Sequence, residues 1–339
     1  MLDLFPSRQA GPFGRRLKRE RGARVPVTVV TGFLGAGKTT LIRRFLKSPE
    51  GAGTAVIVNE FGAVGIDDVL IRDSAEETVL LGNGCVCCIT RTDLQVALRK
   101  LVFDRERGTV PPFARVVIET SGLADPAPIL QTFSTDRALG GEFHIDVVLA
   151  MADAVNGEAE LDSAAEARKQ IILADRLVIS KTDLATPAIV ESLTRRLKAL
   201  NPHAAIDIAI AGALDPDRII EPATSERGGF VAEAEHADGI ASFVIAQDQP
   251  IEWPTFSRAM ETLIALRGSD LLRVKGILNV AGCRGPVVVQ YVQHLAHPPV
   301  ELEFWPDANR KSRVVFITRD IAERDVKALF TTVAALAKP

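Results

Sequence analysis

The stretch that decides the fold is Val25-Pro-Val-Thr-Val-Val-Thr31, followed by Gly32-Phe-Leu-Gly-Ala-Gly37-Lys38-Thr39. The first part is a short β-branched run, which is typical of a buried parallel strand. The second part fits the pattern G-x-x-x-x-G-K-[ST], and apolar residues at helical spacing follow it over residues 39–46. A strand, a glycine-rich turn and a helix in this order form the context in which the pattern binds phosphate.

The phosphate loop, residues 32–39, carries residue types suited to a nucleoside triphosphate. Its glycines let backbone N–H groups turn inward around an anion, and the following helix presents its positive end. We expect Lys38 to neutralise the β- and γ-phosphates and the Thr39 hydroxyl to ligate Mg2+. The predicted nucleotide contacts along this segment are Gly35, Ala36, Gly37, Lys38, Thr39 and Thr40.

Working outward, similar apolar runs and helical patterns alternate along the first two thirds of the chain. The predicted strands cover residues 54–59, 114–119, 145–150, 176–180 and 205–210, and the predicted helices cover residues 92–103, 164–173 and 188–200. Strands that alternate with helices predict an α/β fold, with a mostly parallel sheet covered on both faces. Together with the phosphate loop, this pattern predicts a P-loop NTPase domain.

The pattern changes after a polar segment rich in Gly and Pro. Strands are predicted over residues 240–246, 271–278, 287–292, 301–304 and 313–318, and helices over residues 253–267 and 320–336. Consecutive strands with flanking helices favour a smaller α+β domain with an antiparallel sheet. The predicted parts are therefore a flexible basic arm (1–24), the P-loop domain (25–221), a linker (222–238) and a C-terminal α+β domain (239–339).

Composition and charge exclude several classes of protein. Of the 339 residues, 47% are hydrophobic and 24% charged, as in ordinary globular proteins. The net charge is -3, but residues 1–24 carry +5, so the remaining residues are acidic overall. They are poorly suited to binding the phosphate backbone of a nucleic acid. No stretch approaches the ~18 apolar residues of a membrane span, and the start lacks the apolar core of a secretion signal. We expect a cytoplasmic protein without a nucleic-acid or membrane partner.

A guanine site is predicted where the strand over residues 176–180 ends. A carboxylate at Asp183 can accept hydrogen bonds from N1–H and the 2-amino group of guanine, an arrangement that adenine does not offer. The stem of Lys181 can cover the face of the base. Ser180 stands where the usual GTPase motif carries Asn. Capping of the next helix by Asp183 is a compatible alternative.

Acidic residues follow two of the other predicted strands. Glu119 lies at the carboxyl end of a strand beside the phosphate loop, where it can hold a metal-bound water or position the attacking water. Gly122 lets the backbone approach the γ-phosphate, and the alternative for this segment is a helix N-cap formed by Ser121 or Asp125. Asn59-Glu60-Phe61-Gly62 and Asp67 fall where a GTPase has its γ-phosphate-sensing switch. Glu60 is a candidate metal ligand and Asp67 a candidate contact to Mg2+ or water, unless both are simply solvated.

The second strong motif is Gly82-Asn-Gly-Cys85-Val-Cys87-Cys88. Thiolates are soft ligands that select Zn2+ or Cu+ over Mg2+, and the glycines let the backbone curl so that three sulfurs converge. Three sulfurs leave one tetrahedral position open, which suits transfer of a metal better than storage. The alternatives are buried structural cysteines and a redox pair of Cys87 and Cys88. The remaining cysteine, Cys283, is predicted to be a small buried residue.

Taken together, these motifs resemble the CobW-type metallochaperone GTPases, which belong with the urease- and hydrogenase-maturation GTPases to a wider P-loop family. The matching segments are 32–40, 59–62, 84–88, 119–122 and 180–183, with 273–278 and 292–299 in the C-terminal part. The resemblance implies hydrolysis of GTP with Mg2+, and Zn2+ or Co2+ bound by the cysteines with Glu60. It also implies a client metalloprotein that receives the metal, and a nucleotide-dependent homodimer. This chain departs at Ser180, in its linker without a histidine-rich tract, and in its basic arm.

The mechanism expected from this organisation couples two ligands. GTP–Mg2+ orders the switch and the cysteine segment together, and hydrolysis releases both so that the metal leaves. Two other functions remain open on the sequence alone. One is a non-catalytic zinc sensor or buffer, and the other is an ATP-dependent kinase or ligase built on the same loop.

Overall fold

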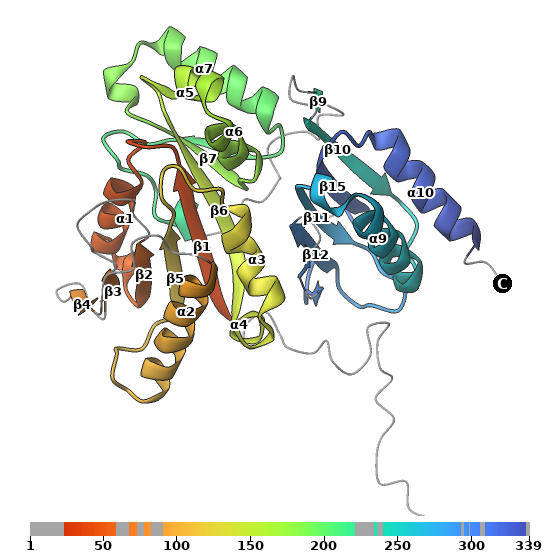
Figure 1. Cartoon of the computed structure of the whole chain (residues 1–339), viewed down its shortest axis with the longest axis horizontal. Helices are drawn as coiled ribbons and strands as arrows, with labels where there is room; N and C mark the ends of the chain where they lie inside the picture. Colours follow the sequence, from red (N-terminus) through yellow and green to blue (C-terminus); the bar gives the residue numbers. More distant parts are fainter. Residues whose placement is uncertain are drawn as a thin grey trace, which may run out of the picture. The chain divides into compact units, whose positions relative to one another are not determined.

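The computed structural model describes residues 24–58, 68–72, 78–82, 91–220, 234–235, 240–292, 295–297, 299–305 and 309–336. The chain divides into two compact units between residues 237 and 238. Each unit is built around one β-sheet (Figure 1). No helix in the described part of the chain combines the length and the apolar character that a membrane span needs.

The sheet of the first unit has the strand order β4-β3-β2-β5-β1-β6-β7-β8. Its parallel strands are β2 (Thr54–Val58), β5 (Arg115–Glu119), β1 (Val25–Gly32), β6 (Phe143–Asp153), β7 (Arg176–Ser180) and β8 (Ala205–Ile208). The hairpin of β3 (Asp68–Arg72) and β4 (Thr78–Gly82) extends the β2 edge in antiparallel pairing. The predicted α/β class, with a mostly parallel sheet, is confirmed.

Helices cover both faces of this sheet because its central strands are apolar on both sides. One face packs against α1 (Lys38–Lys47) and α8 (Asp217–Ile220), through Leu41, Ile42, Phe45 and Ile219. The other face packs against α5 (Gly157–Ser163), α6 (Ala165–Ile172) and α7 (Pro187–Leu200), through Leu161, Ile171, Leu193 and Leu197. Short 3-10 turns occur at Pro49–Gly51 and Thr182–Leu184.

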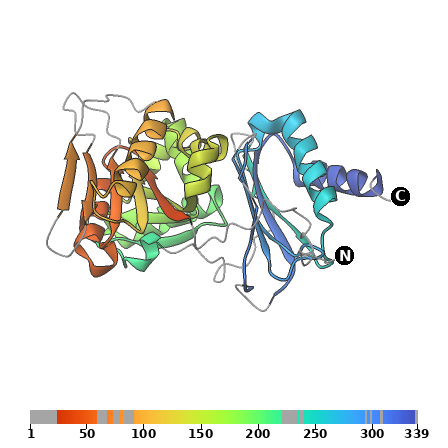
Figure 2. The same cartoon turned by 90° about the horizontal axis from the view of Figure 1, so that it is seen from below.

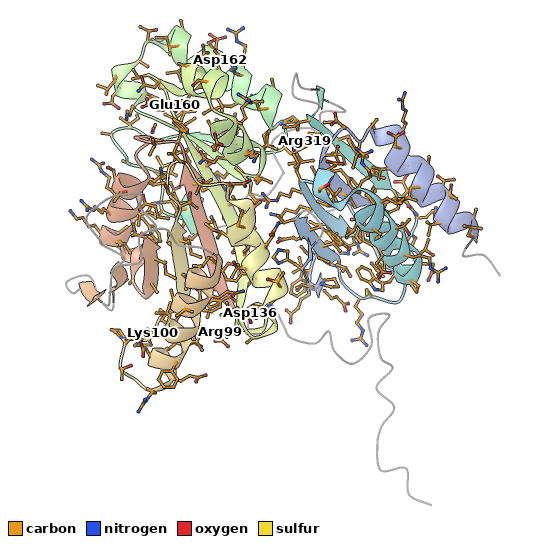
Figure 3. All side chains as sticks on the ribbon, viewed as in Figure 1. Arg99, Lys100, Asp136, Glu160, Asp162 and Arg319 are labelled. Atoms are coloured by element: carbon orange, nitrogen blue, oxygen red, sulfur yellow. The ribbon has the colours of Figure 1, made fainter. Side chains whose placement is uncertain are left out.

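Three further helices lie together in the first unit: α2 (Arg91–Glu106), α3 (Ala127–Thr135) and α4 (Arg137–Glu142). Asp136, between α3 and α4, caps α4 by accepting hydrogen bonds from the N–H groups of Ala138 and Leu139. The same carboxylate accepts a 2.6 Å bond from Nη2 of Arg99 on α2 (Figure 3). A single buried carboxylate therefore joins α2 to the α3–α4 corner.

The sheet of the second unit has the order β13-β12-β11-β15-β10-β9, and β14 pairs with β12. Its strands are β9 (Ala234–Glu235), β10 (Ile240–Gln247), β11 (Arg273–Leu278), β12 (Val287–Val292), β13 (Leu295–Ala296), β14 (Val300–Glu301) and β15 (Ser312–Arg319). The helices α9 (Trp253–Arg267) and α10 (Glu323–Leu336) pack on the same face of this sheet (Figure 2). A 3-10 turn at Gly268–Asp270 follows α9. The second domain therefore has the predicted α+β architecture.

Several boundaries differ from the prediction for local reasons. The last helix begins at Glu323 rather than at residue 320, because Asp320 has a left-handed φ of 51° and Asp325 caps the first turn at Ala322. The strand predicted over residues 301–304 is the shorter β14. Its partner β12 begins at Val287, directly after Pro286, which has no N–H to continue the ladder. The helices α3, α4 and α5 and the hairpin β3–β4 have no counterpart in the prediction.

Candidate nucleotide site

The phosphate loop turns between β1 and α1, at the carboxyl edge of the parallel strands. Gly37, the residue that precedes α1, has a left-handed φ of 94°, a conformation that disfavours residues with a Cβ. Lys38 is 7% exposed, and its Nζ donates to the carbonyl oxygens of Gly32 at 2.8 Å and Phe33 at 3.0 Å. The ammonium group is thus folded back over its own loop, at the positive end of α1.

Thr39 and Glu119 lie together beside this loop. The Thr39 hydroxyl donates a 2.6 Å hydrogen bond to Oε1 of Glu119, which is 5% exposed at the end of β5. The two side chains meet because β5 pairs with β1, with Glu119 opposite Val30. A hydroxyl and a carboxylate are hard oxygen donors of the kind that Mg2+ accepts in proteins. The donor set therefore fits a magnesium ion at the predicted position.

The segment that follows Glu119 packs tightly on the phosphate loop. A Cβ placed on Gly122 would lie 2.6 Å from the backbone nitrogen of Leu34, and only glycine permits so close an approach. Thr120, the residue after Glu119, donates from its hydroxyl to that of Thr31 at 2.9 Å. Asp125 caps α3 through the N–H of Ala127, so the predicted capping role and the close backbone approach coexist.

At the end of β7, Ser180 is tied to the phosphate loop. Its hydroxyl donates a 2.7 Å hydrogen bond to the carbonyl oxygen of Ala36, and the side chain is 3% exposed. A longer contact of 3.4 Å reaches the carbonyl oxygen of Ala152. Ser180 therefore connects the predicted base-binding strand to the predicted phosphate site, even though it is shorter than the Asn of the usual motif.

Lys181 is held by a carboxylate that sequence reasoning missed. The residue has a left-handed φ of 55°, and its Nζ lies 2.5 Å from Oδ2 of Asp153 at the end of β6. Asp153 is 1% exposed and also accepts from the N–H of Val155 and from Nδ2 of Asn156. Burial alone would raise the pKa of Asp153, but the hydrogen bond from Lys181 and the two others lower it overall. The sequence pattern that identified Glu119, an acidic residue at the end of an apolar strand, could also have identified Asp153.

Asp183 reaches a loop that follows the next strand. Its Oδ1 accepts a 3.3 Å hydrogen bond from the N–H of Ala211, which has a left-handed φ of 47°. The neighbouring Gly212 packs on α1, since a Cβ there would lie 2.8 Å from Cγ2 of Thr40. The loop after β8 thus belongs to the same neighbourhood, and no motif in the sequence had identified it.

Five of the predicted site residues lie outside the described residues: Glu60, Asp67, Cys85, Cys87 and Cys88. In the part of the chain that is described, no group of three or more His, Cys, Asp or Glu side chains is arranged to hold a metal ion. Cys283 is described; it packs against the apolar core of the second unit, and burial raises the pKa of its thiol to about 11. A metal site at the cysteine motif therefore remains a prediction from the sequence.

The backbone around those five residues is nevertheless informative. In the β3–β4 hairpin, Asp68, the first residue of β3, pairs with Gly82, the last residue of β4. Val58, the last residue of β2, lies opposite Glu119 in the ladder with β5. Val58, Asp68 and Gly82 therefore lie at the same edge of the sheet as Glu119.

Comparisons with known proteins identify the family of the chain. A family model described as the CobW/HypB/UreG nucleotide-binding domain matches residues 26–207, and one described as the cobalamin synthesis protein CobW C-terminal domain matches residues 240–334. The zinc chaperone YjiA of Escherichia coli is 36% identical over 90% of this chain and 98% of its own length. The zinc-regulated GTPase metalloprotein activator 1 of Schizosaccharomyces pombe is 37% identical, over 56% of this chain and 47% of its own length.

A solved structure is similar across both units. The crystal structure of Zn(II)-bound YjiA GTPase from E. coli aligns with a TM-score of 0.64 at 32% sequence identity. The alignment covers 91% of this chain and 99% of that chain. The whole architecture, and not the phosphate-loop unit alone, is therefore shared with that protein.

Proposed function

The chain belongs to the CobW/HypB/UreG family, and from that membership we propose that it is a GTP-hydrolysing metallochaperone. Its substrate is GTP, and its cargo is Zn2+, with Co2+ as the second candidate. The relatives named as zinc chaperones and as a zinc-regulated GTPase support this choice of nucleotide and metal. Cys85, Cys87 and Cys88, with Glu60, bind the cargo, and a client metalloprotein receives it.

The observation that carries the nucleotide half is the Thr39–Glu119 hydrogen bond beside Lys38. Lys38 turns from the carbonyl oxygens of its own loop toward the β- and γ-phosphates. Thr39 and Glu119 are the residues that would hold Mg2+. When bound, Mg2+ neutralises charge on the phosphate oxygens. Glu119 and Asp67 orient the attacking water, while Gly122 brings its backbone up to the γ-phosphate.

Recognition of the base follows from the end of β7. Asp183 accepts from N1–H and the 2-amino group of guanine, and Lys181, held by Asp153, covers the base with its stem. Ser180 fixes the distance between this end of the site and the phosphate loop through its bond to Ala36. Discrimination against adenine is assigned to Asp183, because adenine offers no pair of donors in that place.

The coupling between GTP and metal follows from the paired backbone at the β3–β4 hairpin. Glu60 and Asp67 precede Asp68 in the sequence, and the three cysteines follow Gly82; Asp68 and Gly82 are directly paired in the hairpin. If loss of the γ-phosphate displaces the segment with Glu60 and Asp67, the displacement reaches the cysteine segment through the paired residues Asp68 and Gly82. In this proposal the GTP state holds the metal and hydrolysis loosens it. A nucleotide-dependent homodimer is part of the same proposal.

The decisive experiment compares two activities in the purified full-length chain. Phosphate release is measured with GTP and with ATP, and Zn2+ stoichiometry is measured by titration with a chromophoric chelator as competitor. Lys38→Ala is expected to abolish GTP turnover and to keep the Zn2+ stoichiometry, with the weaker Zn2+ affinity of the state without GTP. Cys87→Ser is expected to lose Zn2+, whereas the matched control Cys283→Ser, which alters a thiol in the second unit, binds Zn2+ like the wild type.

Each contrary result selects one of the other functions. Turnover of ATP in preference to GTP would indicate a kinase or ligase. Zn2+ binding without any turnover would indicate a sensor or buffer. Equal Zn2+ binding by the wild type and Cys87→Ser would remove the cysteine motif from the metal site.

A further inference from the structure

Gln170 is a fully buried polar side chain on α6, outside the residues assigned to GTP and Zn2+. It is 0% exposed, although glutamine is usually a surface residue. Its Nε2 donates to the carbonyl oxygen of Gly122 at 3.0 Å and to that of Ala124 at 2.9 Å. Both hydrogen bonds of the NH2 group therefore go to residues 122–124, which follow Glu119 at the end of β5.

The residues that Gln170 binds, 122–124, include Gly122, which packs against the phosphate loop. Gly122 approaches Leu34 so closely that a Cβ would lie 2.6 Å from the Leu34 nitrogen. A second link from α6 runs from Nζ of Lys169 to Oδ2 of Asp125 at 3.1 Å. Residues 122–125 are therefore bonded to α6, and Gly122 also packs against the phosphate loop.

The orientation of the Gln170 amide follows from its surroundings. Two carbonyl oxygens face the NH2 group, so the flipped amide would put three oxygens together. Oε1 points away from them and has no hydrogen-bond partner among the described residues.

We propose that Gln170 is a positioning residue for GTP hydrolysis. Its side-chain amide holds the backbone of Gly122 in the position in which that backbone contacts the γ-phosphate. This inference rests on the proposed function and names a residue that governs its rate. The triphosphate and the diphosphate differ only at the γ-phosphate. Loosening the segment therefore weakens the hold on the triphosphate and slows turnover, while GDP binds as before.

The chain supplies a matched control in Asn201. This residue is 1% exposed, and its Nδ2 donates to the carbonyl oxygens of Ile171, Ile172 and Ala174, at and just beyond the carboxyl end of α6. Gln170 and Asn201 are thus both buried amides that bind backbone carbonyls, and only Gln170 binds the segment after Glu119. Gln170→Met and Asn201→Leu remove each amide at nearly constant volume.

The experiment measures melting temperature, GDP affinity, affinity for a non-hydrolysable GTP analogue, and kcat for GTP in the three full-length proteins. Loss of the two hydrogen bonds in Gln170→Met is expected to lower kcat by about tenfold and to weaken the analogue relative to GDP. Asn201→Leu is expected to lower the melting temperature while keeping the wild-type kcat and the wild-type ratio of the two affinities.

Two results would overturn the inference alone: a wild-type kcat in Gln170→Met, or an equal loss of kcat in Asn201→Leu. A wild-type protein that does not hydrolyse GTP would overturn the proposed function and this inference with it. Should Gln170→Met be unfolded at the assay temperature, Lys169→Met decides, because it loosens the same segment from the surface. Its kcat is expected to fall about twofold, as for one partly exposed ion pair, and an unchanged kcat would refute the role.

Discussion

The hydroxyl of Thr39 and the carboxylate of Glu119 are joined by a 2.6 Å hydrogen bond between the first turn of α1 and the last residue of β5. These residues are 80 positions apart in the chain, and the β1–β5 ladder brings them together. The hydroxyl and the carboxylate are the two oxygen donors that would hold a Mg2+ ion at this site. Its carboxylate is therefore the most direct target for testing the site.

Glu119→Gln tests the charge of that carboxylate. The amide oxygen can still accept the bond from Thr39, so the variant is expected to fold like the wild type. Without the charge, kcat for GTP should fall roughly a hundredfold, a typical loss for a group that positions or activates water. Single-turnover phosphate release measures the effect. A wild-type rate in this variant would remove Glu119 from the reaction.

Ser180→Ala tests the tie between the base and phosphate ends of the site. Removing the 2.7 Å bond to Ala36 is expected to cost about 1 kcal/mol, so GTP and GDP should both bind about fivefold more weakly. Fluorescent-nucleotide titration gives both affinities. Ser163→Ala, which removes an exposed hydroxyl that donates to the carbonyl oxygen of Ala159 within α5, serves as the control. Loss of affinity for GTP alone would contradict the assignment.

Asp183→Ala tests base recognition. The variant loses the charged acceptor for guanine, so the preference for GTP over ATP should fall by about ten- to a hundredfold. Competition titrations with both nucleotides measure the preference, and Asp162→Ala, a change of an exposed acid on α5, should leave it intact. An unaltered preference in Asp183→Ala would mean that another group reads the base.

His203 gives the first unit a pH-dependent stability. Burial lowers the pKa of its imidazole, and Nε2 has no hydrogen-bond partner among the described residues. Between the folded and unfolded pKa values the unfolded chain binds more protons. The contribution of neutral His203 to the free energy of unfolding is therefore fully present above the unfolded pKa of 6.5. It is lost as the pH falls through the lower pKa of the folded state.

His203→Gln is therefore expected to lose less stability than the wild type between pH 7.5 and pH 5. Urea unfolding at a series of pH values provides the two curves. Parallel curves would show that His203 titrates alike in the folded and unfolded chains.

The sequence predicted the fold well wherever one local signal dominated. The helix Trp253–Arg267 and the strand Arg176–Ser180 have their predicted bounds because periodic apolar residues end at clear boundaries. The helices α3 and α4 were missed because their limits depend on Asp136, whose capping role is completed by Arg99, 37 positions away. Such tertiary contacts leave no local pattern.

The candidate site divides in the same way. Glu119 and Asp183 could be located from the sequence because each follows a predicted strand, and their roles stay predictions. Gln170 could not be located from the sequence, because a glutamine in an amphipathic helix is usually exposed. Its role depends on the carbonyl oxygens of Gly122 and Ala124, which only the tertiary structure brings to it. The loop at Ala211 is recognised only through its bond to Asp183.

The central claim is that the nucleotide state sets the affinity for zinc, and one titration tests it. Zn2+ affinity is measured by competition with a chelator in protein saturated either with a non-hydrolysable GTP analogue and Mg2+ or with GDP and Mg2+. We expect tighter binding in the triphosphate state by about 5–150-fold, the usual range of coupling between two sites. Equal Zn2+ affinities in the two states would contradict the account.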